Sequence, residues 1–279
     1  MASIALPLAW FTALGQSADL PPRSAQFSQR VEQLKAHIER VDQQAEQLRA
    51  PEFPVGKDWF NSPPLTFGKQ LAGKITVLDF WTYCCINCIH ILPDLAELEE
   101  RYAGYPVAFV GVHSAKFDNE KVSKNIRDAV LRYEIAHPVV NDDIMHMWQR
   151  IGVRSWPSLA VVGPKGNLML MVSGEGNKEL IDACITAALA FYPKDIVRHD
   201  PIPMSPEKDN LRIDAPLSYP GKLAIDTEGR RLFISDSNHH RIVVTDLDGN
   251  SIETIGSGRI GLADGGYDEA QFFRLQGLA

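Results

Sequence analysis

Two cysteines at the start of a helical pattern constrain this chain more than any other feature. The apolar run Ile75–Trp81 predicts a buried strand, the pattern Ile89–Leu98 predicts a helix, and Cys85-Ile86-Asn87-Cys88 stands between them. Cysteines at this spacing in a first helical turn lie on one face, so they can close a disulfide or hold a soft metal. The positive end of the helix also stabilises a thiolate on the first cysteine. A strand, this motif and a helix in that order predict redox chemistry.

The composition sets broad limits on the kind of protein. The 279 residues are enough for two domains, and 45% hydrophobic with 23% charged residues is typical of a soluble globular protein. A net charge of −7 argues against nucleic acid or an anionic membrane as partner, because phosphate binding needs a basic surface. Three of the four cysteines (Cys84, Cys85 and Cys88) are clustered, which indicates a reactive or metal-binding group. Cys184 is expected to pack in the core.

The first residues raise the question of export. The run Ala2–Leu14 is apolar, but no Lys or Arg precedes it, Pro7 interrupts it and the first basic residue is Arg23. A signal peptide needs a basic start, and the run is too short to cross a bilayer. These absences predict a cytoplasmic protein, with export left open.

Four segments are expected along the chain. Residues 1–50 form an N-terminal extension, in which the apolar spacing from Phe27 to Val41 predicts a helix that ends before Pro51. This helix either packs on the main domain, which we favour because a coiled coil needs more heptads, or binds a partner. Residues 193–216 hold five prolines and little apolar periodicity, so they form a linker between domains at 51–192 and 217–279.

Residues 51–192 alternate between strand and helix patterns, which predicts an α/β domain with helices on both faces of a central sheet. The expected strands are 75–81, 107–113, 158–163 and 168–173, and the expected helices are 85–102, 120–133, 144–151 and 178–192. A Gly/Pro turn between the last two strands indicates an antiparallel hairpin, so the sheet is mixed.

Residues 217–279 change to short β patterns separated by Gly and Asp turns. Four such runs, at 223–226, 231–236, 241–246 and 252–255, are typical of one propeller blade. The opening Pro220-Gly221-Lys222-Leu223-Ala224 partly recurs as Leu275-Gln276-Gly277-Leu278-Ala279. One blade cannot bury both of its faces, so the all-β part is expected to be the start of an incomplete propeller.

The residues around the cysteines resemble the thioredoxin fold. In that fold a buried Asp lies six residues before the first cysteine, as Asp79 does, and a proline lies five after the second, as Pro93 does. A cis-proline faces the disulfide from a later strand, and Trp156-Pro157-Ser158 stands where that proline would be. The longer segment 112–143 resembles the redoxin branch of cytochrome-maturation and peroxiredoxin-like proteins.

The β runs resemble an NHL repeat through Asp236-Ser237-Asn238-His239-His240-Arg241-Ile242. A thioredoxin-like domain with Cys-Cys-Ile-Asn-Cys, followed by NHL repeats, is similar to the family of NHL-repeat-containing protein 2, from about Pro51 to the end. The resemblance implies a thiol–disulfide oxidoreductase that needs no cofactor. Its partners would be a protein client with thiols or a disulfide, an unidentified electron donor, and a protein bound by the propeller.

The resemblance also implies a role for each site residue. Cys85 would attack as the thiolate, and Cys88 would resolve the mixed disulfide. Asp79, with its ionisation disfavoured by burial, would take the proton of Cys88. A cis Pro157 would present the backbone of Trp156 to an extended client peptide. The alternatives are a structural disulfide or metal site, an Asp79 that only stabilises a turn, and a trans-proline at a strand edge.

Cys84 departs from the thioredoxin pattern, which has a tryptophan at this position. A third thiol could accept a transferred disulfide, help to hold Cu(I) or Zn(II) together with His90, or pack as a small apolar group. Redox chemistry is favoured over metal binding because Asp79 and the cis-proline add nothing to a metal site. His113, at the end of a central strand, either approaches the site or is structural.

Two functions of different classes remain. One is thiol–disulfide exchange through Cys85 and Cys88, tethered to a protein-binding propeller. The other is a non-enzymatic interaction scaffold with a regulatory or metal-binding cysteine cluster. Residues 200–279 hold 13 acidic and 8 basic residues, which argues against RNA as the partner of the propeller.

Overall fold

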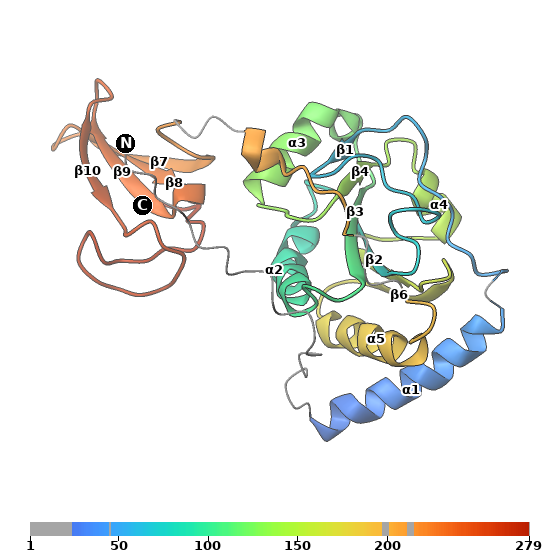
Figure 1. Cartoon of the computed structure of the whole chain (residues 1–279). Helices are drawn as coiled ribbons and strands as arrows, with labels where there is room; N and C mark the ends of the chain where they lie inside the picture. Colours follow the sequence, from blue (N-terminus) through green and yellow to red (C-terminus); the bar gives the residue numbers. More distant parts are fainter. Residues whose placement is uncertain (1–23, 45, 197–200, 211–214, 279) are drawn as a thin grey trace, which may run out of the picture.

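The computed structural model describes residues 24–44, 46–196, 201–210 and 215–278. The apolar run Ala2–Leu14 and parts of the predicted linker lie outside the described residues. The described residues form an α/β domain and a separate four-stranded sheet, which confirms the fold class predicted from the sequence (Figure 1). None of the helices within these ranges combines the length and the apolar character needed to cross a membrane.

A six-stranded mixed sheet forms the centre of the α/β domain, in the order β1-β4-β3-β2-β5-β6. The strands are β1 (Trp59–Phe60), β2 (Ile75–Trp81), β3 (Val107–His113), β4 (Val139–Asn141), β5 (Ser158–Val162) and β6 (Leu168–Ser173). The central strand β2 pairs in parallel with β3 and antiparallel with β5. The predicted hairpin is formed by β5 and β6. Every residue of β2 is buried, as expected for a strand covered on both faces.

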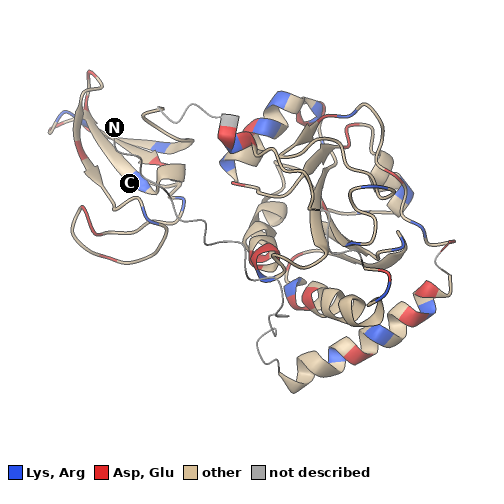
Figure 2. Ribbon diagram, in the orientation of Figure 1, with Lys and Arg blue, Asp and Glu red and all other residues tan. Residues whose placement is uncertain are grey.

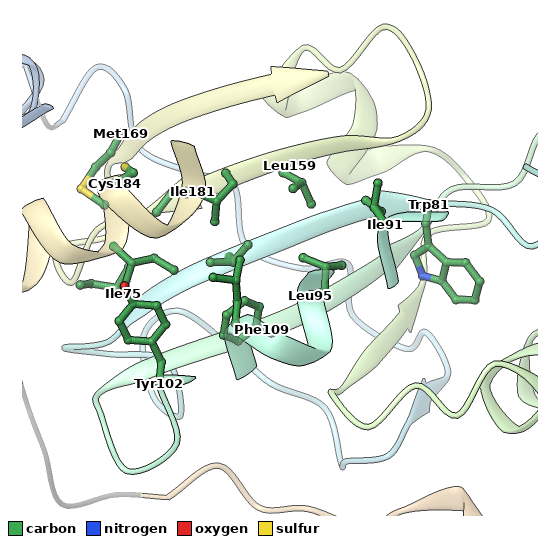
Figure 3. Packing of buried hydrophobic residues seen from close by; sticks show 14 of the residues in the cluster. Ile75, Trp81, Ile91, Leu95, Tyr102, Phe109, Leu159, Met169, Ile181 and Cys184 are labelled. Atoms are coloured by element: carbon green, nitrogen blue, oxygen red, sulfur yellow. The ribbon is translucent and has the colours of Figure 1, made fainter. Parts of the chain in front are cut away.

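Helices α2 (Ile86–Arg101), α3 (Ser123–Arg132) and α5 (Lys178–Phe191) share one hydrophobic core with one face of the sheet. Figure 3 shows Ile91 and Leu95 of α2 beside Phe109 and Leu159 of the sheet. Alternate residues of a strand point to opposite faces, so Asp79 faces this core together with its neighbours two residues away. The motif helix therefore covers the face of the sheet that carries Asp79.

The opposite face of the sheet has a second core. Its sheet residues include Leu78, Phe80 and Val110, and they pack against α4 (His146–Ile151) and against apolar side chains of residues 53–71. Helices thus lie on both faces of the sheet, as the alternating pattern predicts. The second core is shared by α4 and an irregular segment, because residues 53–71 contribute only the two-residue strand β1.

The helix predicted in the N-terminal extension is α1 (Ala25–Asp42), which packs on α5. Its buried residues repeat at helical spacing, and Ser24 caps its first turn by accepting a hydrogen bond from the N–H of Phe27. At the far end, the hydroxyl of Tyr192 donates to Asp42 over 2.8 Å. Figure 2 shows that α1 carries charges of both signs along its length. The helix therefore belongs to the domain core on one side and faces solvent on the other.

One predicted helix is too long. The pattern Glu120–Tyr133 begins inside a 3₁₀ turn, η1 (Asp118–Lys121), and α3 follows that turn. Val122 separates the two with an extended backbone at φ −77° and ψ 114°. A β-branched residue tolerates this conformation well, so the apolar periodicity continues through a break in the helix. The break leaves the side chain of Glu120 outside the helix that sequence periodicity places it in.

The second sheet is a single antiparallel blade in the order β10-β9-β8-β7. Its strands are β7 (Pro220–Asp226), β8 (Arg231–Asp236), β9 (Arg241–Asp246) and β10 (Ser251–Ile255). The buried carboxylate of Asp236 accepts hydrogen bonds from the N–H of Ser218 and from the guanidinium of Arg241. Strand ends are thus fixed by Asp236 and Arg241, and the sheet has the form that begins an NHL propeller.

The blade lies on the side of α2 and α3 (Figure 1). The amide of Asn238 donates to the carbonyl of Arg132, and the guanidinium of Arg274 donates to the carbonyl of Tyr133. Part of the predicted linker also contacts the α/β domain, because the N–H of Ser205 donates to the carbonyl of Asn61. The linker is therefore not a free tether over its described residues.

Candidate functional site

The two motif cysteines occupy different environments at the start of α2. Cys85 is the N-cap residue, with extended backbone at φ −92° and ψ 106°, and its side chain is half-buried. Cys88 lies in the first turn and is fully buried against the sheet. Solvent therefore reaches the side chain of Cys85 but not that of Cys88.

The thiol of Cys88 is held in its protonated form by its surroundings. Burial raises its pKa well above the ordinary cysteine value, and a hydrogen bond with the Cys85 side chain and the charge of Asp79 raise it further. The two thiols are therefore within hydrogen-bonding distance of each other. Cys88 consequently needs a base before it can attack.

Asp79 lies on the sheet face that α2 covers, and its charge acts on the thiol of Cys88. Its side chain is 2% exposed, and neither carboxylate oxygen has a hydrogen-bond partner among the described residues. Burial raises the pKa of Asp79 to about 7, while the charge of His137 opposes the rise and that of Glu99 adds to it. A carboxyl group that titrates near neutrality can exchange a proton with a neighbouring thiol.

The Trp156–Pro157 peptide bond is cis, the geometry that the thioredoxin resemblance implies. The indole N–H of Trp156 donates to the carbonyl of Ser114 over 3.0 Å, and its ring packs on Trp148 at 4.1 Å between centroids. The backbone N–H and carbonyl of Trp156 make no hydrogen bond within the described part of the chain. The side chain is therefore fixed while the backbone is free to pair with another peptide.

Glu120 organises the loop that carries the cysteines, and sequence analysis does not identify it. One carboxylate oxygen accepts from the Thr82 hydroxyl at 2.6 Å and from the N–H of Cys84 at 3.1 Å. The other accepts from the N–H groups of Lys116 and Phe117. Although burial raises the pKa of Glu120, these hydrogen bonds lower it below the ordinary glutamate value. No local signal could reveal this role, since Glu120 lies 36 residues from Cys84 in sequence.

His113 supports the same loop from the end of β3. Its Nε2 accepts a hydrogen bond from the N–H of Tyr83 at 3.4 Å, and its ring stacks on Tyr83 with 5.5 Å between centroids. Burial lowers the pKa of His113 to about 4, so the ring is neutral at physiological pH. Of the two roles open to His113, the geometry favours the structural one.

Cys84 is exposed beside the motif, and its thiol contacts Glu120. Partial desolvation of the thiol, followed by the hydrogen bond and charge of Glu120, raises the pKa of Cys84 to about 11. His90 points elsewhere, with its Nδ1 3.3 Å from a carboxylate oxygen of Glu175. Within the described ranges, no group of three or more His, Cys, Asp or Glu side chains is arranged to hold a metal ion.

Replacing Glu120 by Gln is expected to lower the free energy of unfolding by roughly 2–3 kcal/mol, because Gln has one acceptor oxygen instead of two and at least one backbone N–H loses its partner. The difference in free energy of unfolding between the parent and the variant should become smaller at acidic pH. A carboxyl group whose folded pKa is depressed stabilises the fold above its ordinary value of 4.5, and this stabilisation disappears as the pH falls through the folded pKa. Urea unfolding across this pH range measures both effects. Glu100→Gln, an exposed position on α2, is the matched control, and an equal loss there would contradict the prediction.

Comparison with known proteins relates both the α/β domain and the four-stranded blade to known families. Residues 73–168 match a thioredoxin-like family and residues 217–244 match the NHL repeat. The chain is 50% identical over 254 residues to "Protein SUPPRESSOR OF QUENCHING 1, chloroplastic" of Arabidopsis thaliana, which covers 90% of this chain and 24% of that protein. It is 45% identical over 246 residues to "NHL repeat-containing protein 2" of Bos taurus, covering 87% of this chain and 34% of that protein.

A more distant relative matches half of the chain over nearly its whole length. "Thiol-disulfide oxidoreductase YkuV" of Bacillus subtilis is 21% identical over 140 residues, which cover 50% of this chain and 93% of that protein. The two longer relatives extend well beyond the matched region, so this chain spans about a quarter to a third of their length.

The comparison corrects one prediction from the sequence. The absence of an export signal predicts a cytoplasmic protein, whereas the relative with 50% identity is chloroplastic. The prediction is therefore wrong. It depends on residues Ala2–Leu14, which carry no structural description, and on a test for secretory signals alone. Organelle transit peptides have a different composition, rich in Arg and Ser, that such a test does not address.

Proposed function

Since the chain is a homologue of NHL repeat-containing protein 2 that joins a thioredoxin-like domain to an NHL repeat, we propose that it exchanges thiols and disulfides with a protein client through Cys85 and Cys88. One observation carries the proposal. A half-buried cysteine caps a helix, a buried cysteine hydrogen-bonds to it from behind, and a carboxyl group with a pKa near neutrality lies beneath them.

The first step is attack on a client disulfide by the Cys85 thiolate. A bond forms between Cys85 Sγ and one client sulfur, the client S–S bond breaks, and the second client sulfur leaves as a thiolate. The N-cap position favours this step, because the unpaired N–H groups and the partial positive charge of the helix start stabilise the attacking anion. Only Cys85 of the pair is accessible enough to accept the client.

The second step releases the client. Asp79 takes the proton of Cys88, Cys88 Sγ bonds to Cys85 Sγ, and the remaining client sulfur leaves with the electron pair of the broken mixed disulfide. The client is reduced by two electrons and the Cys85–Cys88 pair is oxidised. A dithiol reductant restores the pair, and the same steps in reverse oxidise a client.

An extended client segment would pair with the backbone of Trp156. Its free N–H and carbonyl can add one strand-like contact beside the cysteines, and main-chain pairing accepts many client sequences. Lys116, with its ammonium 5.7 Å from the centre of the Trp156 ring, borders the same place. We assign further client recruitment to the NHL repeat, because such repeats form protein-binding propellers.

Replacing Cys85 by Ser is expected to reduce catalysis of insulin reduction by dithiothreitol to the uncatalysed rate, because no other accessible thiol has both a helix N-terminus and a resolving partner. Turbidity of the released insulin chain measures the rate. Cys184→Ala is the matched control, since Cys184 is a buried thiol of α5 that lies beside Met169 and Ile181 (Figure 3). Equal rates for the parent protein and Cys85→Ser would contradict the proposed thiol–disulfide exchange and favour a non-enzymatic interaction scaffold.

A further inference from the structure

Four unpartnered polar atoms gather beneath the motif. Both carboxylate oxygens of Asp79, the indole N–H of Trp81 and Nε2 of His137 are buried and make no hydrogen bond to any described residue. Unsatisfied groups of this kind are costly, so several in one place require an explanation. The mechanism above uses Asp79 and leaves the indole and the imidazole without a role.

Gly111 shows that the indole and the imidazole meet on the strand next to Asp79. It is the register partner of Asp79 on the parallel strand β3, so a side chain at this position would lie beside the Asp79 carboxyl. A Cβ built on Gly111 would lie 3.0 Å from Nε1 of Trp81 and 3.2 Å from Nε2 of His137. Because Gly111 has no side chain, the indole and the imidazole can approach it closely, together with a methyl carbon of Val139 that would lie 3.0 Å from the same Cβ. A water that bridged the Asp79 carboxyl and Nε2 of His137 would give both groups a hydrogen-bond partner, which is the usual role of a buried water.

His137 continues the chain of polar groups toward the surface. Its Nδ1 lies 2.7 Å from a carboxylate oxygen of Glu99, a residue of α2. The side chain of His137 is 5% exposed and that of Glu99 is 23% exposed, so burial decreases along the series from Asp79 to Glu99. Although burial lowers the pKa of His137, Glu99 and Asp79 raise it above the ordinary histidine value. The three groups are therefore coupled electrostatically as well as by position.

The series ends at a cavity. Glu99 and His137 both line a hollow of about 540 Å³ between α2, the segment Tyr133–His137 and the C-terminal residues Phe273 and Arg274. This cavity lies apart from Cys84 and Cys85, neither of which lines it. A proton that reached Glu99 would thus have an outlet that does not pass the bound client.

We propose that His137 and Glu99 form a proton path that connects Asp79 with this cavity, with one water bridging Asp79 and Nε2 of His137. The path rests on the proposed function. During resolution Asp79 takes the proton of Cys88 and returns to its anionic form by passing a proton to the water and to Nε2. Nδ1 then gives a proton to Glu99, which releases it into the cavity. His137 and Glu99 touch neither client nor cysteine, so they act through Asp79 as positioning residues.

The test follows the two thiolates that a coloured aromatic disulfide releases from the full chain. All proteins carry Cys84→Ser, so that Cys85 is the accessible thiol. Attack by Cys85 releases the first coloured thiolate, and attack by Cys88 on the mixed disulfide releases the second. His137→Gln and Glu99→Gln are each expected to slow the second phase about tenfold near neutral pH and to leave the first unchanged.

The pH dependence of the second phase separates a proton path from a structural role. The charged groups that act on Asp79 are His137, Glu99 and, when ionised, Cys88. His137 lowers the pKa of Asp79, so His137→Gln should move the midpoint of the pH–rate profile upward. Glu97→Gln is the matched control. Glu97 lies on the same helix and pairs with Lys178 and Arg101 at the surface, so neither phase should change.

The outcomes distinguish the path from the function on which it rests. A parent protein without a second phase would overturn both. If the parent shows both phases, and Glu99→Gln and His137→Gln have the same second-phase rate and the same midpoint of the pH–rate profile as the parent, the path alone is overturned. Should His137→Gln unfold, Glu99→Gln decides, because Glu99 is partly exposed and its replacement preserves side-chain size. Restoration of the second phase by Glu99→Asp would support proton transfer.

Discussion

Replacing Asp79 by Asn is expected to stabilise the reduced protein, and to do so more strongly in alkali than in acid. The pKa of Asp79 rises from 3.8 in the unfolded chain to about 7 in the fold. Between these values the folded state binds more protons than the unfolded state, so the free energy of unfolding falls as the pH rises, and it levels off above the folded pKa. The gain from Asp79→Asn should be larger at about pH 8 than at about pH 5 by roughly 2–3 kcal/mol.

Urea unfolding of parent and variant at the two pH values measures this difference directly. Asp94→Asn is a suitable control, because Asp94 lies on the outer side of α2 within 3.6 Å of the Lys178 ammonium. A gain that does not grow with pH would mean that Asp79 ionises normally in the fold. The same substitution should slow release of the client about a hundredfold near neutral pH, since Cys88 loses its base. Stability and catalysis therefore change in opposite directions at this residue.

The central strands could be predicted with their correct ends because burial on both faces leaves a continuous apolar run. The bounds of β2 and β3 are those read from the sequence. β1 and β4 could not be predicted, since two and three residues are too few to show a period. They pair only because the fold brings Trp59 opposite Val140. The length of a strand, and not its importance, decides whether its pattern is visible.

The residues of the candidate site also fall into those that could be predicted from the sequence and those that could not. Cys85 and Cys88 could be selected because they stand between a predicted strand and a predicted helix, and Asp79 could be selected through the resemblance to the thioredoxin fold. Glu120 and His137 could not, since they reach the site from 36 residues beyond Cys84 and 38 beyond Glu99. Periodicity also places Glu120 in a helix that in fact begins after Val122. Contacts between residues that are distant in sequence produce no periodic pattern. Glu120 and His137, which set the environment of the site, therefore could not be identified from the sequence.

Cys88→Ser is expected to retain the first attack and to lose turnover. The Cys85 thiolate still forms a mixed disulfide with a client, but no neighbouring thiol releases it. Attack from within the site has an effective concentration far above that of a thiol in solution, so turnover should fall about a hundredfold or more. A covalent complex that survives non-reducing electrophoresis and dissolves on reduction is the expected product. The double variant Cys85→Ser, Cys88→Ser is the control, and it should form none.

Cys84 is the one residue that could rescue Cys88→Ser, and the electrostatics of the loop argue that it does not. Asp79, with a pKa of about 7, is a competent base beside Cys88. The carboxylate beside Cys84 is Glu120, whose pKa lies below the ordinary value, so it is a poor base for a thiol whose own pKa is about 11. If Cys88→Ser turned over at the parental rate and lost this activity when Cys84→Ser was added, Cys84 would be the thiol that resolves the complex.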